Sequence, residues 1–169
     1  MGRKIVKTYL SDGLEAAGAY PNAGSPYPKR VAKLLNEPVV FNFHEGIPAF
    51  EASKRFVLLM NPNIKPFVYL KSLDMDDLGF VCIDPFIVCK DYSVKVPAKD
   101  LSILGLKTPE YALVLSMVTV DKDPQKTTCN LLAPIILNTE TCIGRQVILE
   151  ESFPVRYRIW EGIAALAKG

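Results

Sequence analysis

The sequence is poor in residues that bind metals. It contains one histidine, His44, and four cysteines among 169 residues, and no two cysteines form a CxxC pair. His44 and Glu45 begin a stretch similar to HExxH, but Pro48 takes the place of the second histidine and is incompatible with the helix that such a site needs. A zinc site would lack ligands at suitable spacing, so we expect no metal.

Sequence motifs of nucleotide-dependent enzymes and hydrolases are also absent. There is no GxxxxGK[ST] loop, no GxGxxG turn and no GxSxG segment. The closely spaced Asp74, Asp76 and Asp77 lack the glycine and the distal glutamate of an EF-hand loop. We expect no cofactor and no catalytic residue, and therefore not an enzyme. A hydrolase that depends on His44 is one alternative, and retained activity of a His44→Ala variant would exclude it.

Long hydrophobic runs are missing as well. The longest are residues 111–120 and 131–137, whereas a membrane-spanning helix needs about 18–20 apolar residues. Residues 1–10 contain basic side chains but no apolar stretch of the kind found in signal peptides. We therefore expect a cytoplasmic protein without a membrane segment, in which the cysteines are buried free thiols.

The net charge is small, but its distribution along the chain is uneven. Twenty basic and eighteen acidic side chains give a formal charge of +2, too little to imply nucleic acid as an obligatory partner. Residues 1–35 contain six basic and two acidic side chains, whereas residues 74–91 contain five aspartates and one lysine. The second segment is either an ordinary solvated surface or an acidic face for a basic partner, and without a partner in view the solvated surface is favoured. The first segment leaves open the binding of single-stranded nucleic acid.

Thirteen prolines and ten glycines are spread along the chain and argue against long helices. Short runs that alternate apolar and polar residues, or are rich in β-branched residues, predict strands instead. These runs cover residues 4–10, 39–43, 55–60, 67–71, 79–83, 87–89, 93–96, 111–120, 128–138 with a break at Pro134, and 146–149. Short helices are predicted at residues 29–35, at 98–104 with Gly105 as the C-cap, and at 158–167.

This pattern predicts an all-β fold. We expect a small antiparallel β-barrel with short helical segments, and a sandwich is the alternative arrangement of the same strands. The length and a hydrophobic content of 49% suit one domain over residues 1–169. Residues 12–38, rich in proline and glycine, are predicted to form a surface insertion, and residues 158–169 a C-terminal tail.

Several segments, taken in order, resemble a known family. They are FNFHEGIPAFE at 41–51, LKSLD at 70–74 followed by Phe80 and DPF at 84–86, NLLAPIILN at 130–138, and GRQV at 144–147. In this order and spacing they resemble the flagellar assembly factor FliW family over roughly residues 39–152. The segment 12–38 is longer than the family leads us to expect, and the tail at 158–169 is an addition to it.

The resemblance implies a regulator, built on a small β-barrel, that is not an enzyme. Members of this family bind the carbon storage regulator CsrA, a small dimeric RNA-binding protein, and relieve its repression of flagellin translation. They also bind flagellin, so the two partners alternate on one protein, which is expected to be a monomer when free. The alternative function is a single-stranded nucleic-acid-binding β-barrel module, with a basic and aromatic face formed by Arg55, Lys65, Phe67, Tyr69 and Lys71.

The predicted partner-contacting residues are Glu45, Phe50, Asp74, Asp76, Asp77, Asp84, Phe86 and Asn138. The aspartates are chosen because their charge complements a basic partner such as CsrA. Phe50 and Phe86 follow turns and are either exposed anchors or plugs at an end of the barrel. For Asp84 the alternative role is to cap a turn, and for Asn138 it is to bind backbone groups near the Pro134 break.

A second group is predicted to be structural: Gly46, Pro48, Pro85, Asn130, Pro134 and Gly144. Gly46 and Pro48 are expected to fix a turn, and Asn130 to bind exposed backbone at Pro134. The alternating pattern also assigns five side chains to the core, namely Phe41, Phe43, Phe80, Leu131 and Ile135.

Overall fold

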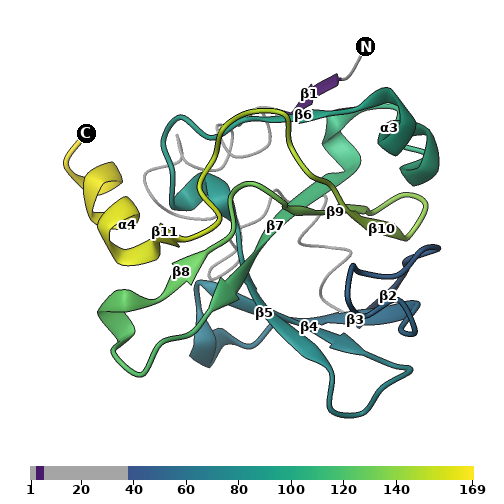
Figure 1. Ribbon diagram of the computed structural model, residues 1–169, viewed down its shortest axis with the longest axis horizontal. Coiled ribbons are helices and arrows are strands. Elements are labelled where there is room, and N and C mark those ends of the chain that lie inside the picture. The colour runs from purple at the N-terminus through teal and green to yellow at the C-terminus, as the bar shows by residue number, and fades with distance from the viewer. Residues whose placement is uncertain (1–2, 6–37) are drawn as a thin grey trace.

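A computed structural model describes residues 3–5 and 38–169 of the chain (Figure 1). The expected insertion at residues 12–38, apart from Pro38, and the expected helix at 29–35 lie outside the described residues. Of the strand expected at residues 4–10, the structure describes β1 (Arg3–Ile5), which pairs with β6 (Val94–Val96) in a two-stranded antiparallel sheet.

Seven strands form a closed barrel. They are β2 (Val39–Asn42), β3 (Arg55–Leu59), β4 (Phe67–Ser72), β5 (Gly79–Ile83), β7 (Ala112–Thr119), β9 (Ile135–Asn138) and β10 (Ile143–Gln146). Successive neighbours from β2 through β5 to β7, β9 and β10 are antiparallel, and β10 closes the ring beside β2. This last pair is parallel, with Ile143 opposite Asn42. The expected barrel is confirmed, with one parallel pair in an otherwise antiparallel ring.

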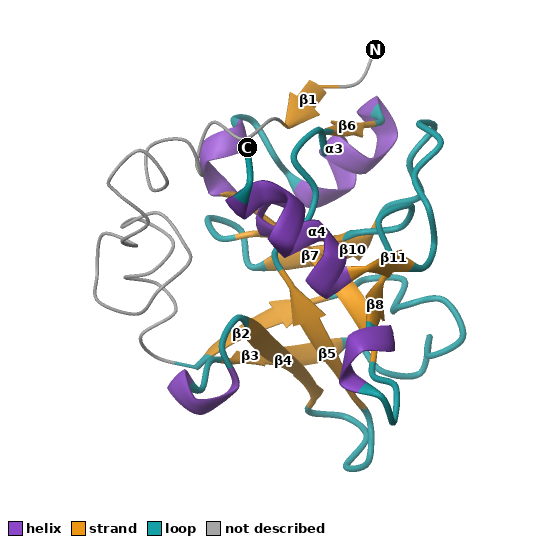
Figure 2. Ribbon diagram, turned by 90° about the vertical axis from the view of Figure 1, so that its left-hand side faces the viewer, coloured by secondary structure: helices purple, strands orange, loops and turns teal. Residues whose placement is uncertain are grey.

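Shorter elements extend the barrel (Figures 1 and 2). Strands β8 (Thr128–Cys129) and β11 (Tyr157–Arg158) continue the sheet beyond the second half of β7. The helices are α3 (Ala98–Leu104) and α4 (Ile159–Ala167), and the single 3₁₀ turns are η1 (Pro62–Ile64), η2 (Pro85–Ile87), η3 (Pro109–Tyr111) and η4 (Pro124–Lys126). Both α-helices were predicted, and Gly105 ends α3 at a φ of 63°, in the left-handed region that favours glycine.

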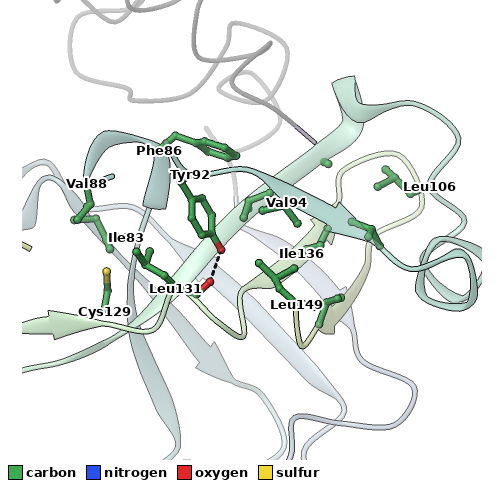
Figure 3. Packing of buried hydrophobic residues seen from close by; sticks show 14 of the residues in the cluster. Ile83, Phe86, Val88, Tyr92, Val94, Leu106, Cys129, Leu131, Ile136 and Leu149 are labelled. Atoms are coloured by element: carbon green, nitrogen blue, oxygen red, sulfur yellow. Dashed lines mark hydrogen bonds between the residues drawn. The ribbon is translucent and has the colours of Figure 1, made fainter. Parts of the chain in front are cut away.

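Strand β7 separates two hydrophobic clusters, which explains why residues 112–116 form a continuous buried run. Leu113 and Leu115 face the inside of the barrel together with Phe41, Phe43 and Ile135. A second cluster lies on the other side of β7, around Tyr92, Val94, Ile136 and Leu149 (Figure 3). A strand buried on both faces has no polar alternation, so residues 112–115 are apolar in succession and the buried Ser116 is the one polar residue of the run.

Two predicted strands are wrong. Residues 87–89 are not a strand, because Ile87 ends η2 and the N–H groups of Val88 and Cys89 both bind the carbonyl of Pro85. Asp84 Oδ1 accepts the N–H of Phe86 and caps that turn. The last predicted strand, 146–149, is displaced by three residues, since β10 spans Ile143–Gln146. The predicted segment 128–138 is also interrupted earlier than at Pro134, because Asn130 Oδ1 accepts the N–H groups of Leu132 and Ala133 and forms a turn after β8.

Candidate partner-binding site

Two loops at one end of the barrel are joined by Asp74. Its Oδ2 atom accepts the backbone N–H groups of Lys54 and Arg55, each at 2.8 Å, and its Oδ1 atom lies 2.8 Å from Nη2 of Arg55. The backbone bond from Lys54, the Arg55 guanidinium and the Arg55 backbone bond lower the pKa of Asp74. The β2–β3 loop (residues 43–54) and the β4–β5 loop (residues 73–78) therefore present one continuous surface.

The β4–β5 loop combines acidic and apolar side chains on its exposed surface. Asp76 and Asp77 are exposed, and the apolar Leu73 and Met75 are 43% and 42% exposed. From the β2–β3 loop, Phe50 is 37% exposed and packs edge-on against Phe80, with ring centroids 5.3 Å apart. We call these residues, with Asp74, the acidic–apolar surface. It offers charge for a basic partner and apolar area for close contact.

Local hydrogen bonds hold the β4–β5 loop in shape. The Ser72 hydroxyl accepts the N–H groups of Asp74 and Met75 at 3.1 and 2.9 Å, which closes the turn after β4. The same oxygen lies 2.6 Å from the buried Ser53 hydroxyl in the other loop. Except for Phe50, the side chains of the acidic–apolar surface are therefore carried by a turn that is held by its own hydrogen bonds.

The β2–β3 loop depends on Gly46 and Ile47. Gly46 has a φ of 74°, and a Cβ at this position would lie 2.6 Å from the Cα of Glu51. Ile47 is buried, whereas Pro48 beside it is exposed. The structure thus places Gly46 and Pro48 in the expected turn, and the side chain that anchors this loop to the core is Ile47.

Glu45 lies in the same loop and forms an ion pair with Arg145 of β10. The Arg145 Nη1 atom is 2.6 Å from Glu45 Oε2, and its Nε atom is 2.5 Å from Asp100 Oδ1 in α3. The pKa of Glu45 is lowered by its hydrogen bond to Arg145 and by the charge of that guanidinium. Glu45 is 64% exposed, so its carboxylate is accessible to a partner from the β2–β3 loop.

Three predicted contact residues are corrected by the structure, because Asp84, Phe86 and Asn138 are all buried. Asp84 caps η2, and Phe86 packs edge-on against Tyr92 at 5.4 Å. The Asn138 Nδ2 atom donates to the carbonyl of Leu104, and its Oδ1 atom accepts the N–H of Glu140. Asp84 therefore has the capping role given as its alternative. Asn138 binds backbone groups, but those of Leu104 and Glu140 and not the expected ones near Pro134.

The remaining predicted structural residues lie where strands turn or approach closely. A Cβ added to Gly144 would lie 2.4 Å from Cζ of Phe43, so only glycine fits between β10 and this ring. Pro85 is the first residue of η2 and is buried. The carbonyl of Pro134 accepts the N–H of Val147, which continues the contact between these two segments beyond the end of β10.

The face proposed for nucleic acid does not present free aromatic rings. Phe67 packs edge-on against Trp160 at 6.0 Å, and the Tyr69 hydroxyl lies over Gly79. Arg55 is paired with Asp74. Base stacking requires exposed ring faces, so this face offers little for it. The basic segment 1–35 lies outside the described residues except for 3–5.

Sequence reasoning missed Leu73, Met75 and Arg145. A signal for the first two was present, because apolar side chains inside an acidic turn, Leu73-Asp74-Met75-Asp76-Asp77, have no core to enter. Arg145 gave no such signal, because its partners Glu45 and Asp100 are distant in the sequence.

The described residues offer neither a metal-binding cluster nor a membrane-spanning helix. Over residues 3–5 and 38–169, no cluster of three or more metal-ligating side chains is found. In the same residues, no helix is long and apolar enough to cross a membrane.

The barrel and its loops match proteins of one family. A family model described as FliW protein matches residues 31–159. The chain belongs to the FliW family. The flagellar assembly factor FliW of Clostridium tetani is 36% identical over 126 residues, which cover 74% of this chain and 87% of that protein. The FliW of Natranaerobius thermophilus is 34% identical over 137 residues, or 80% of this chain and 91% of the relative.

A solved structure agrees with this assignment. The crystal structure of a flagellar assembly factor FliW is 33% identical in sequence and superposes with a TM-score of 0.68, covering 71% of this chain and 84% of that one. Helix α4 lies almost entirely beyond the segment that the FliW family model matches, which ends at residue 159.

Proposed function

We propose that this FliW-family protein is a cytoplasmic flagellar assembly factor that binds CsrA and flagellin as alternating partners. Binding to CsrA would relieve repression of flagellin translation, and binding to unassembled flagellin would withdraw the protein from CsrA. Such a switch needs two partners whose binding is anticooperative and requires no catalytic group. The protein is expected to be a monomer when free.

The observation that carries the proposal is the acidic–apolar surface. Asp76 and Asp77 form no ion pair within the described residues, although Lys71 Nζ donates to the backbone carbonyl of Asp76 at 2.7 Å. They supply negative charge next to the exposed side chains of Leu73, Met75 and Phe50. Charge complementarity favours encounter with a basic partner, and the apolar side chains supply contact area after encounter. We assign this surface to CsrA because an RNA-binding protein presents basic side chains.

Titration calorimetry of the full chain against CsrA tests the proposal. Binding is expected for the free protein and is expected to disappear after saturation with flagellin. A D76N/D77N double variant is expected to bind CsrA about tenfold more weakly, with a smaller dependence on salt. The matched control is Glu161→Gln, which removes an exposed acid in α4, far along the chain from these loops.

The possible results test the proposed partners and the proposed contact surface independently. No binding to either protein would overturn the proposed function. Wild-type affinity of the D76N/D77N variant for CsrA would leave the partner in place but remove the acidic–apolar surface as its contact. Simultaneous binding of both proteins without mutual weakening would overturn the alternation between partners.

A further inference from the structure

A polar pocket lies on the extension of the sheet formed by β7, β8 and β11. Its volume is about 350 Å³, and its lining residues are Thr119, Asp121, Lys126, Thr128, Arg156 and Arg158. In Figure 1 the β7–β8 loop that carries part of this lining is at the lower left, and the β4–β5 loop of the acidic–apolar surface is at the lower right. The pocket is therefore separate from the site described above, and its volume suits a small ligand.

Strand pairing places the pocket's side chains on one face. Thr119 lies opposite Thr128 in β8, and Thr128 lies opposite Arg158 in β11. Directly paired residues in antiparallel strands point to the same side of the sheet. The neighbouring pair in the same two strands, Cys129 and Tyr157, points to the opposite side: Cys129 is buried, and Tyr157 packs against the core. Arg158 therefore points away from the core, and Arg156, which precedes β11, is also exposed.

The charges of the lining do not cancel. Lys126, Arg156 and Arg158 face a single lining carboxylate, Asp121, which leaves an excess of two positive charges. The Asp121 Oδ1 atom accepts the N–H of Asp123 at 2.9 Å, so that oxygen is used to fold the loop.

The two arginines have few partners of their own. The Arg158 Nη1 atom lies 3.5 Å from the carbonyl of Gln125, a long hydrogen bond. Lys126 has an acidic neighbour, with its Nζ atom 3.8 Å from Asp123. Within residues 3–5 and 38–169, neither Arg156 nor Arg158 forms an ion pair with a carboxylate. Their donors are available to a ligand that enters the pocket.

We propose that this pocket binds an anion of the phosphate class, either free inorganic phosphate or the phosphate group of a small monoester. Planar guanidinium groups bind phosphate oxygens through paired hydrogen bonds, and the Thr119 and Thr128 hydroxyls add neutral donors. With Asp123 beside Lys126 counted, the pocket keeps an excess of one positive charge, which favours an anion such as a phosphomonoester. The proposal does not depend on binding to CsrA or flagellin.

An NMR titration of the full chain tests the pocket. Inorganic phosphate is added to ¹⁵N-labelled protein at constant ionic strength, with chloride as the replaced anion, and glycerol phosphate is titrated in a second series. Saturable shifts are expected for the amides of residues 119–128 and 156–158. An R156Q/R158Q double variant is expected to bind about tenfold more weakly or worse, because two charge-assisted donors are lost. Lys107→Gln, an exposed lysine that is not in the pocket lining, is the control and is expected to bind as the wild type does.

Each outcome decides between alternatives. Tighter binding of the ester identifies monoesters as the source of the ligand, and tighter binding of phosphate identifies the free anion. Shifts that do not saturate, or equal affinity in the double variant with an otherwise unchanged spectrum, would overturn the proposal. A response to an RNA oligonucleotide, but to neither phosphate nor ester, would also overturn it and assign the surface to nucleic acid.

Discussion

Gly162 in α4 lies directly against the carbonyl oxygen of Val88. A Cβ at Gly162 would come within 2.2 Å of that oxygen, too close for any side chain. Two further contacts join the helix to the barrel: Trp160 packs against Phe67, and its Nε1 atom donates to the carbonyl of Pro124 at 2.8 Å. The C-terminal segment is therefore packed onto the domain, although it extends beyond the matched family segment.

Replacement of Gly162 by alanine is expected to destabilise the protein by about 1–3 kcal/mol or to release α4, because the backbones must separate to admit the methyl group. Helix propensity alone predicts the opposite sign, since alanine is favoured over glycine by about 1 kcal/mol. Urea unfolding measures the change, and fluorescence of Trp160, the only tryptophan, reports the position of α4. Ala165→Ser, at an exposed position of the same helix, is the control. A Gly162→Ala variant as stable as the wild type would contradict the close contact.

Stability is expected to depend on pH through Asp84. Burial raises the pKa of this carboxyl to about 7, against the smaller opposing effect of the hydrogen bond from Phe86 N–H. In the unfolded chain the pKa is about 3.9, so between these values the folded protein holds a proton that unfolding releases. Stability should fall as the pH rises from about 4 to about 7, with a slope approaching 1.4 kcal/mol per pH unit, and then level off.

The Asp84→Asn variant removes this ionisation and keeps an oxygen that accepts the N–H of Phe86. Its stability relative to the wild type should increase between pH 5 and pH 8, as measured by urea unfolding at each pH. Asp91→Asn, at an exposed position, provides the comparison and should show no such trend. A stability difference between Asp84→Asn and the wild type that stays constant with pH would show that the carboxyl is not protonated in the fold.

Most of the barrel was predictable because its strands obey local rules. Strands β2 to β5 either alternate apolar and polar residues or are bounded by turn residues. Helix α3 ends at Gly105, which has the positive φ that this position requires. Two errors came from local side-chain caps, at Asp84 and Asn130, and the third arose where a long-range contact decides. The start of β10 depends on Gly144 fitting against Phe43, and no local pattern reveals the distance between those residues.

The candidate site was predictable only in part, for a similar reason. An aspartate in a turn looks the same in sequence whether it is exposed, as Asp76 is, or buried, as Asp84 is. The difference arises because the η2 turn containing Phe86 is covered by the second hydrophobic cluster, whereas the β4–β5 loop extends from the end of the barrel. Burial of a polar residue is set by what packs over its turn, which is tertiary information.

The two acids that contact Arg145 are expected to differ in their contributions. Asp100 is 15% exposed, so Asp100→Asn should reduce stability by about 1–2 kcal/mol by weakening a shielded, charge-assisted hydrogen bond. Glu45 is 64% exposed, and Glu45→Gln should leave the urea midpoint unchanged because solvent screens this pair. Equal losses from both substitutions, or a greater loss from Glu45→Gln, would contradict this order.

Tyr92 connects the second hydrophobic cluster to the turn after β8. Its buried hydroxyl donates to the carbonyl of Leu131 at 2.8 Å (Figure 3). Tyr92→Phe should preserve the packing against Phe86 and Phe153 but leave this carbonyl without its donor, at a cost of about 1–3 kcal/mol in urea unfolding. Tyr69→Phe is the matched control, since the Tyr69 hydroxyl makes no hydrogen bond within the described residues, and its effect should stay within about 0.5 kcal/mol. Equal stability of the two variants would mean that the Tyr92 hydroxyl contributes nothing to the free energy of unfolding.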